Sequence, residues 1–145
     1  MKKGSFKNMK KQNQRNILFL IKKEDGISRA KIAEKLDISR ATVTNIVKEL
    51  LEMELVTEAK MGKSSGGRRP TLLKLNPAGA QVVAFEWGIE YLKAVLLDFE
   101  AEIILKDKIK IKNNSFAEYK NKSLKLIKKY EDYLAEENNI IGVGL

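Results

Sequence analysis

The stretch that decides the fold of the first half of this chain is residues 28–52, SRAKIAEKLDISRATVTNIVKELLE. Its first serine is placed to cap a short helix over residues 29–36, because a serine side chain accepts a hydrogen bond from a free backbone N–H at a helix start. Asp37-Ile38-Ser39 forms a tight turn, and Ser39 caps a further helix that runs to about Glu54. Two short helices joined by such a turn indicate a helix-turn-helix motif.

The second helix of this motif has two distinct faces. Its apolar face carries Val43, Ile46, Val47, Leu50 and Leu51. The opposite face carries small and hydrogen-bonding residues, namely Ala41, Thr44, Asn45, Lys48 and Glu52, with Arg40 and Thr42 on the flanks. Such side chains suit base edges in the DNA major groove, and stability alone would favour Glu or Lys over Thr44 and Asn45. We therefore predict that this face contacts DNA; the alternative is an ordinary solvated helix face.

A basic helix is expected before the motif, over residues 8–23. Its apolar stripe consists of Met9, Ile17, Leu18, Leu20 and Ile21, and it is surrounded by Lys10, Lys11, Arg15, Lys22 and Lys23. Asp25-Gly26 ends the helix. We expect Lys10 and Lys11 to touch DNA phosphates.

After the motif, residues 56–59 and 71–75 can pair as an antiparallel hairpin, which would form a wing. Its tip contains Lys63 and the segment Gly66-Gly67-Arg68-Arg69-Pro70. Paired arginines between permissive glycines and a rigid proline suit a narrow minor groove, where the negative potential is enhanced. The alternative is a solvated loop with two surface arginines.

The charge is concentrated in the first half of the chain. The net charge is +9, but residues 1–75 carry 18 Lys and Arg against 8 Asp and Glu, whereas the remainder carries 10 against 11. This asymmetry favours a polyanion-binding module joined to a near-neutral one. An anionic membrane would explain the charge but not the motif.

Without cysteine or histidine, disulfides, thiolate nucleophiles, histidine bases and Cys/His zinc sites are excluded within the chain. With no apolar run near 18 residues, a cytoplasmic location is expected.

Asn76-Pro77-Ala78-Gly79 marks a boundary, so we expect two domains, 1–76 and 80–145. The second contains three apolar segments at 80–87, 91–99 and 102–112, each rich in Val, Ile and Leu. A long amphipathic helix follows at 116–137, and a buried strand begins at residue 140. The inward residues of the helix are expected to be Tyr119, Leu124, Ile127, Tyr130 and Leu134. The predicted fold class is α+β.

The first half resembles the ROK family of bacterial repressors, open reading frames and sugar kinases. The resemblance rests on residues 28–33, 36–39, 42–47, 50–51 and 55–56, and on Gly67-Arg68-Arg69-Pro70. The family typically has a small residue where this chain has Glu54. In the family the Gly-Arg-Arg-Pro segment lies in the wing and is associated with minor-groove contact, so the resemblance assigns that role to Arg68 and Arg69.

The second half is similar to the β-β-β-α-β opening of the actin-like ATPase fold that ROK kinases share. Their first hairpin carries an Asp-x-Gly-Gly-Thr phosphate loop, and here Glu86-Trp87-Gly88-Ile89-Glu90 stands in its place. Only Gly88 is kept, and Glu90 brings a negative charge where a hydroxyl is needed, so we expect no ATP binding of the kinase kind. The family's sugar ligands and Cys/His zinc motif would lie beyond residue 145. We therefore predict no catalytic residue, cofactor or metal, and expect a truncated chain or one completed by a partner.

These features together predict a sequence-specific transcriptional regulator, a repressor of carbohydrate-utilisation genes, and not an enzyme. Its partners would be double-stranded DNA with a pseudo-palindromic operator and a second copy of the chain, with a sugar inducer only in a full-length form. The predicted DNA contacts are Arg40, Ala41, Thr42, Thr44, Asn45, Lys48, Lys63, Arg68 and Arg69. Two alternatives stay open: a ROK-type sugar kinase with a DNA-binding extension, and a truncated, non-catalytic interaction module.

Overall fold

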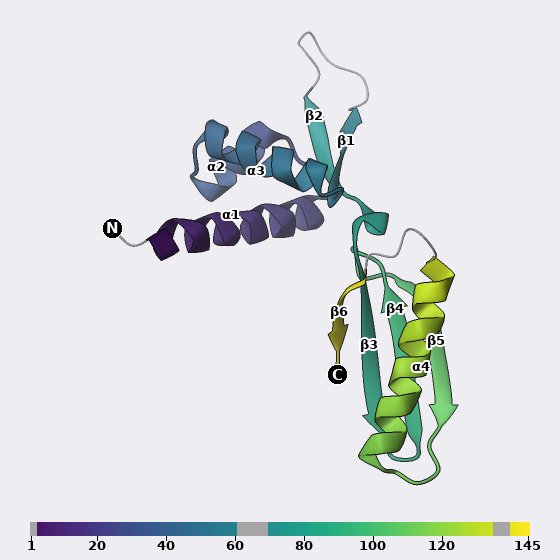
Figure 1. Cartoon of the computed structure of the whole chain (residues 1–145). Helices are drawn as coiled ribbons and strands as arrows, with labels where there is room; N and C mark the ends of the chain where they lie inside the picture. Colours follow the sequence, from purple (N-terminus) through teal and green to yellow (C-terminus); the bar gives the residue numbers. More distant parts are fainter. Residues whose placement is uncertain (1–2, 61–69, 135–139) are drawn as a thin grey trace. The chain divides into compact units, whose positions relative to one another are not determined.

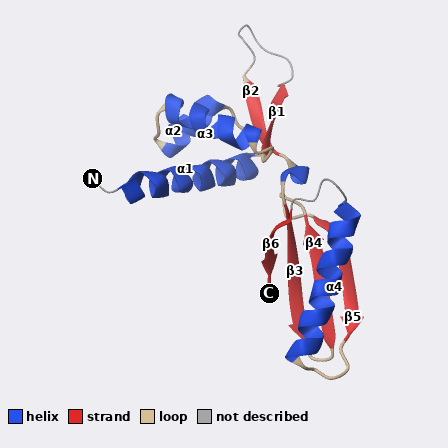
Figure 2. Ribbon diagram, in the orientation of Figure 1, coloured by secondary structure: helices blue, strands red, loops and turns tan. Residues whose placement is uncertain are grey.

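The structure is a computed structural model that describes residues 3–60, 70–134 and 140–145 (Figure 1). The chain divides into two compact units, residues 1–76 and residues 77–145, which we call the first unit and the second unit. The first contains three helices and a two-stranded hairpin, and the second a four-stranded sheet with one long helix (Figure 2). Among the described residues, no helix combines the length and apolar character needed to cross a membrane.

The helices of the first unit are α1 (Lys3–Glu24), α2 (Arg29–Leu36) and α3 (Arg40–Glu52). Both predicted serine caps are present: Ser28 Oγ accepts from the Lys31 N–H at 3.3 Å, and Ser39 Oγ from the Thr42 N–H at 3.0 Å. The helix-turn-helix prediction is therefore confirmed. α1 begins five residues earlier than expected, and α3 ends at Glu52 because Glu54 adopts a left-handed φ of 57°.

The core of the first unit lies between α1, the helix-turn-helix and the hairpin. Its fully buried side chains include Ile17, Ile21, Ile32, Val43, Val47, Leu50 and Leu73. Met9, which the sequence places in the apolar stripe of α1, is not part of this core, since its side chain is 54% exposed. Met9 precedes Ile17 by more than two helical turns, so it lies beyond the part of α1 that contacts the core.

The wing hairpin consists of β1 (Val56–Lys60) and β2 (Thr71–Leu75), which pair in antiparallel register from Val56↔Leu75 to Lys60↔Thr71. Ile27 adds a bridge on the other side of β2: its N–H donates to the Leu73 carbonyl at 3.1 Å and its carbonyl accepts from the Leu73 N–H at 2.9 Å. This bridge fixes the base of the hairpin to the start of the helix-turn-helix. The hairpin tip, residues 61–69, lies outside the described residues.

The second unit begins with a short 3₁₀ turn, Pro77–Gly79, and continues with β3 (Gln81–Gly88), β4 (Tyr91–Leu97) and β5 (Ile103–Lys110). α4 (Phe116–Leu134) and β6 (Ile140–Gly144) follow. The strand order is β5-β4-β3-β6, with β6 parallel to β3 and the other pairs antiparallel. α4 lies against one face of this sheet (Figure 1). The β-β-β-α-β order and the α+β class predicted from the sequence are confirmed.

The helix-facing side of the sheet is apolar. Val83 and Phe85 of β3 and Leu92, Ala94 and Leu96 of β4 are buried with Tyr119, Leu126 and Tyr130 of α4. The prediction that Leu124 faces inward is wrong: it is 53% exposed, and Ser123 is buried instead. Positions 119, 123, 126 and 130 follow the helical repeat, and Leu124 lies about 100° away from that line. Ser123 Oγ accepts a hydrogen bond from Trp87 Nε1 at 3.2 Å.

The predicted final strand is present as β6, but the prediction that this strand is buried is wrong. Ile141 is 61% exposed and Val143 54% exposed, because β6 forms one edge of the sheet and these side chains find no cover among the described residues.

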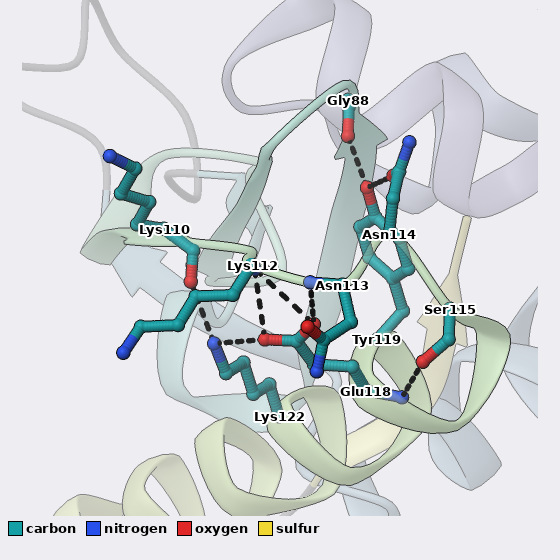
Figure 3. A network of polar contacts seen from close by, with 9 residues as sticks. All are labelled: Gly88, Lys110, Lys112, Asn113, Asn114, Ser115, Glu118, Tyr119 and Lys122. Atoms are coloured by element: carbon teal, nitrogen blue, oxygen red, sulfur yellow. Dashed lines mark hydrogen bonds and ion pairs between the residues drawn. The ribbon is translucent and has the colours of Figure 1, made fainter.

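The connection from β5 to α4 is closed by the Glu118 carboxylate (Figure 3). It accepts hydrogen bonds from the backbone N–H groups of Lys112 at 3.1 Å and Asn113 at 2.7 Å, and it pairs with Lys122 Nζ at 2.7 Å. The hydrogen bond from Lys122, followed by the two backbone donors, lowers the pKa of Glu118 to about 2. One carboxylate therefore joins the end of β5 to the first turns of α4.

Candidate nucleic-acid interface

The exposed face of α3 brings together the residues predicted to read DNA. Arg40, Ala41, Thr44, Asn45 and Lys48 are all exposed, whereas Thr42 is partly buried. The opposite side of the helix is fixed in the core through Val43, Ile46, Val47 and Leu50. The apolar side thus holds the polar side of α3 in one orientation, as a binding surface requires.

The polar groups on this face differ in how far they are already bonded. Thr44 Oγ1 donates to the Arg40 carbonyl at 2.8 Å, and Thr42 Oγ1 lies 2.9 Å from Ser39 Oγ at the helix start. Lys48 Nζ is 3.7 Å from Glu52 Oε1. Within the described part of the chain, the Asn45 amide and the Arg40 guanidinium make no hydrogen bond or ion pair. These two side chains keep their full bonding capacity for a ligand.

An open groove of about 560 Å³ runs along one flank of this face, between α1 and α3. We call it the α1–α3 groove. Its lining residues are Met9, Lys10 and Asn13 of α1 with Thr42, Asn45, Ile46, Lys48, Glu49 and Glu52 of α3. Lys10 was expected to touch phosphate, but its Nζ lies 2.5 Å from Glu49 Oε1. Sequence reasoning missed this pair because the two residues are 39 positions apart and no local pattern links them.

Other basic residues of the first unit also form ion pairs with carboxylates. Arg29 pairs with Glu58 at 2.5 Å, Lys35 with Glu24 at 2.9 Å and Lys74 with Asp25 at 2.9 Å. These exposed pairs contribute little to stability. They do reduce the number of cations that are free to meet a phosphate backbone.

The three wing residues predicted to contact DNA, Lys63, Arg68 and Arg69, lie outside the described residues. The structure places only the strands that lead to them. Their contacts with DNA stay a prediction.

The hairpin between β3 and β4 contains residues 86–90, which the sequence resemblance aligns with the kinase phosphate loop. Gly88 pairs with Tyr91, so Ile89 and Glu90 form a two-residue turn in which Glu90 has a φ of 61°. The Glu86 carboxylate accepts from the Tyr91 hydroxyl and from Lys93 Nζ, the latter at 2.9 Å. These hydrogen bonds, that from Tyr91 first, lower the pKa of Glu86.

Gly88 is the one glycine kept from the phosphate-loop pattern, and the structure gives it a packing role. A Cβ added to Gly88 would meet the Tyr91 ring at 2.0 Å. The same ring has Lys93 Nζ and Lys108 Nζ each 4.9 Å from its centroid. The Tyr91 ring therefore occupies the space beside Gly88. Position 88 needs glycine because any larger residue would clash with this ring.

The three helices, their two serine caps and the following hairpin define a winged helix-turn-helix protein. A family profile described as winged helix-turn-helix DNA-binding matches residues 10–57, which run from α1 into β1. The matched segment contains the helix-turn-helix and both serine caps.

The whole chain is similar to curated repressors. The xylose repressor of Bacillus spizizenii is 37% identical over 107 residues, covering 74% of this chain and 28% of the relative. That of Caldicellulosiruptor bescii is 31% identical over 147 residues, covering 98% and 36%. A solved ROK family transcriptional regulator, a homologue of the Escherichia coli Mlc protein, has the same fold with a TM-score of 0.73 and 23% identity, covering 93% of this chain and 35% of that one.

The chain is similar to xylose repressors, and its fold is that of a ROK family transcriptional regulator. It spans about a third of the length of these relatives.

Proposed function

We propose that this chain is the DNA-binding part of a sequence-specific transcriptional repressor of carbohydrate-utilisation genes. The observation that carries the proposal is the exposed face of α3, where Asn45 and Arg40 have no partner among the described residues while the other side of the helix is locked in the core. The similarity to xylose repressors supports both the regulatory role and the link to carbohydrates.

In this proposal α3 enters the major groove. Asn45, Thr44 and Lys48 read base edges, since an asparagine can bond adenine bidentately and a threonine methyl can touch a thymine methyl. Arg40, Ala41 and Thr42 contact DNA at the helix start, where the backbone N–H groups and the helix dipole favour phosphate. Arg68 and Arg69 enter the flanking minor groove, and Lys63 meets phosphate.

The DNA partner is a pseudo-palindromic operator bound by two copies of the chain. A two-fold symmetric protein reads two half-sites about one helical turn apart. A sugar inducer belongs to this proposal only for a full-length form, because the chain spans about a third of its relatives.

Sugar phosphorylation has no part in the proposed function. Glu90 occupies the turn where kinases of the family hold phosphate, and Glu86 is engaged by Tyr91 and Lys93. The relatives named above are repressors, which agrees with a non-enzymatic role.

Selection of bound duplexes from a random DNA pool tests the proposal directly. We expect enrichment of a site with two related half-sites, and no enrichment would refute the proposal. Asn45→Ala should then cost about 1–3 kcal/mol of discrimination at one base pair. A matched control is Asn121→Ala, which removes an exposed helical asparagine of the second unit. Equal weakening of all sequences by Asn45→Ala would make Asn45 a phosphate contact.

A further inference from the structure

Glu49 places a negative charge beside the DNA-reading face of α3. It follows Asn45 by one helical turn, lines the α1–α3 groove with it, and its side chain is 32% exposed. DNA carries one negative charge for every ~1.7 Å of its axis. A free carboxylate at this position would therefore oppose the approach of the phosphate strand that borders the major groove.

The structure shows both oxygens of this carboxylate bonded to α1. Lys10 Nζ lies 2.5 Å from Glu49 Oε1, and Gln14 Nε2 donates to Glu49 Oε2 at 3.1 Å. Lys10 and Gln14 are four residues apart, so they lie on the same side of α1. Together they hold the carboxylate at the groove, and the Lys10 ammonium neutralises its charge.

Helix stability does not account for the lysine. Residues 3–23 of α1 contain Lys3, Lys7, Lys10, Lys11, Arg15, Lys22 and Lys23 and no acidic residue. Lys10 lies beyond the first turn of α1, so the helix dipole does not stabilise its charge, and residues 3–23 of α1 offer it no carboxylate partner. An exposed ion pair between two helices adds little to folding. The Lys10–Glu49 pair therefore matters more for the charge that α3 presents than for the fold.

We propose that Lys10 is a positioning residue for DNA binding: it neutralises and holds Glu49, so that the flank of α3 does not repel DNA, and it does not itself contact phosphate. This inference rests on the proposed function. It also replaces the expectation that Lys10 and Lys11 have the same role, because Lys11 has no carboxylate partner among the described residues.

The test measures the affinity of the 145-residue chain for a labelled duplex carrying its selected site. The variants are Lys10→Gln, Glu49→Gln, their combination, and Lys7→Gln as the matched control for loss of one positive charge on an exposed side chain of α1. We expect Lys10→Gln to weaken binding about two- to five-fold at low salt, the range that surface charge pairs give. The combined variant should return to within about two-fold of the original chain, and the loss in Lys10→Gln should shrink as salt rises.

The salt dependence separates a positioning role from a direct contact. A lysine that touches phosphate reduces the slope of log affinity against log salt by about one when it is removed. We expect the combined variant to keep the original slope. The swapped pair, Lys10→Glu with Glu49→Lys, should bind at least as tightly as the original chain, and thermal unfolding of every variant confirms that the fold is retained.

Three results would overturn the inference. They are a combined variant as weak as Lys10→Gln, a slope reduced by about one in the combined variant, and equal losses for Lys10→Gln and Lys7→Gln. If the original chain selects no site, the proposed function fails and this role fails with it. If the original chain binds its site and Glu49→Gln does not rescue Lys10→Gln, only this role fails.

Discussion

The exposed face of α3 and the β3–β4 hairpin both present polar side chains to solvent, but they differ in what those side chains bond to. On α3, Asn45 and Arg40 have no partner within the described residues. On the hairpin, Glu86, Tyr91 and Lys93 bond to one another. Polar groups without partners on a rigid element are available to a ligand, whereas a cluster that satisfies itself offers little to bind.

The two regions also differ in what lies beneath them. Val43, Val47 and Leu50 of α3 are almost completely buried in the core of the first unit, so the outer face of the helix has a fixed orientation. The hairpin ends in Ile89, which is 81% exposed and has no such support. The comparison indicates that α3 leaves polar side chains available to a partner, whereas the polar side chains of the hairpin bond to one another.

The largest expected effect comes from removing the support under α3. Leu50→Ala should lower the free energy of unfolding by about 2–5 kcal/mol, because it leaves a cavity in the core of the first unit. DNA binding should fall with it. Leu96→Ala makes the same change in the core of the second unit and is expected to leave DNA affinity unchanged. Urea unfolding and DNA titration of both variants check this, and equal losses of DNA binding would break the comparison.

The next prediction concerns two wing arginines, Arg68 and Arg69, whose DNA role is predicted from the sequence alone. Arg68→Ala combined with Arg69→Ala should weaken binding by about 1–3 kcal/mol, the usual cost of lost specific contacts, and most on A·T-rich flanks. The matched control is Arg29→Ala, since Arg29 already pairs with Glu58 at 2.5 Å. Titration with duplexes that differ only in their flanks measures the effect. The same loss on G·C-rich flanks would refute minor-groove reading.

A smaller effect is expected at Gly88. Gly88→Ala should lower the stability of the second unit by about 1 kcal/mol, because the new methyl displaces the Tyr91 ring from its contacts. Tyr91→Ala in the same chain should remove most of this cost, which unfolding of the single and double variants will show. If Gly88→Ala left stability unchanged and abolished binding of ATP, the hairpin would be a phosphate site after all.

The smallest effect concerns pH. The pKa of Glu118 is about 2 in the folded chain against an ordinary value of 4.5, so its contribution to stability is fully present above pH 4.5 and is lost as the pH falls through 2. Glu118→Gln should therefore be less stable at neutral pH and should lose less stability between those two values. Glu102→Gln, which alters an exposed carboxylate, is the control. If Glu118→Gln and the original chain lost the same stability as the pH fell from 4.5 to 2, this prediction would be contradicted.

Most of the fold could be predicted because its signals are local. A serine before each short helix and apolar residues at helical spacing lie within a few residues of the helices that they determine. The order of three strands, a helix and a strand follows from periodicity in the same way. The exposed face of α3 was predictable for the same reason, since the buried face of a helix defines the opposite one.

What could not be predicted depends on contacts between distant residues. The burial of Ser123 in place of Leu124 depends on how α4 is rotated against the sheet, and the sequence of α4 alone leaves two apolar lines available. The packing of Tyr91 on Gly88 was missed because the glycine matched a different pattern first.

The sequence by itself determined that this chain contains a helix-turn-helix with a polar outer face, a basic wing and an α+β second half, since caps, periodicity and charge act over a few residues. Only the tertiary structure decided which of the polar groups remain available. Lys10 and Glu49 are far apart in the sequence and meet only when α1 packs beside α3, so the charge that α3 presents to a partner is set by the fold.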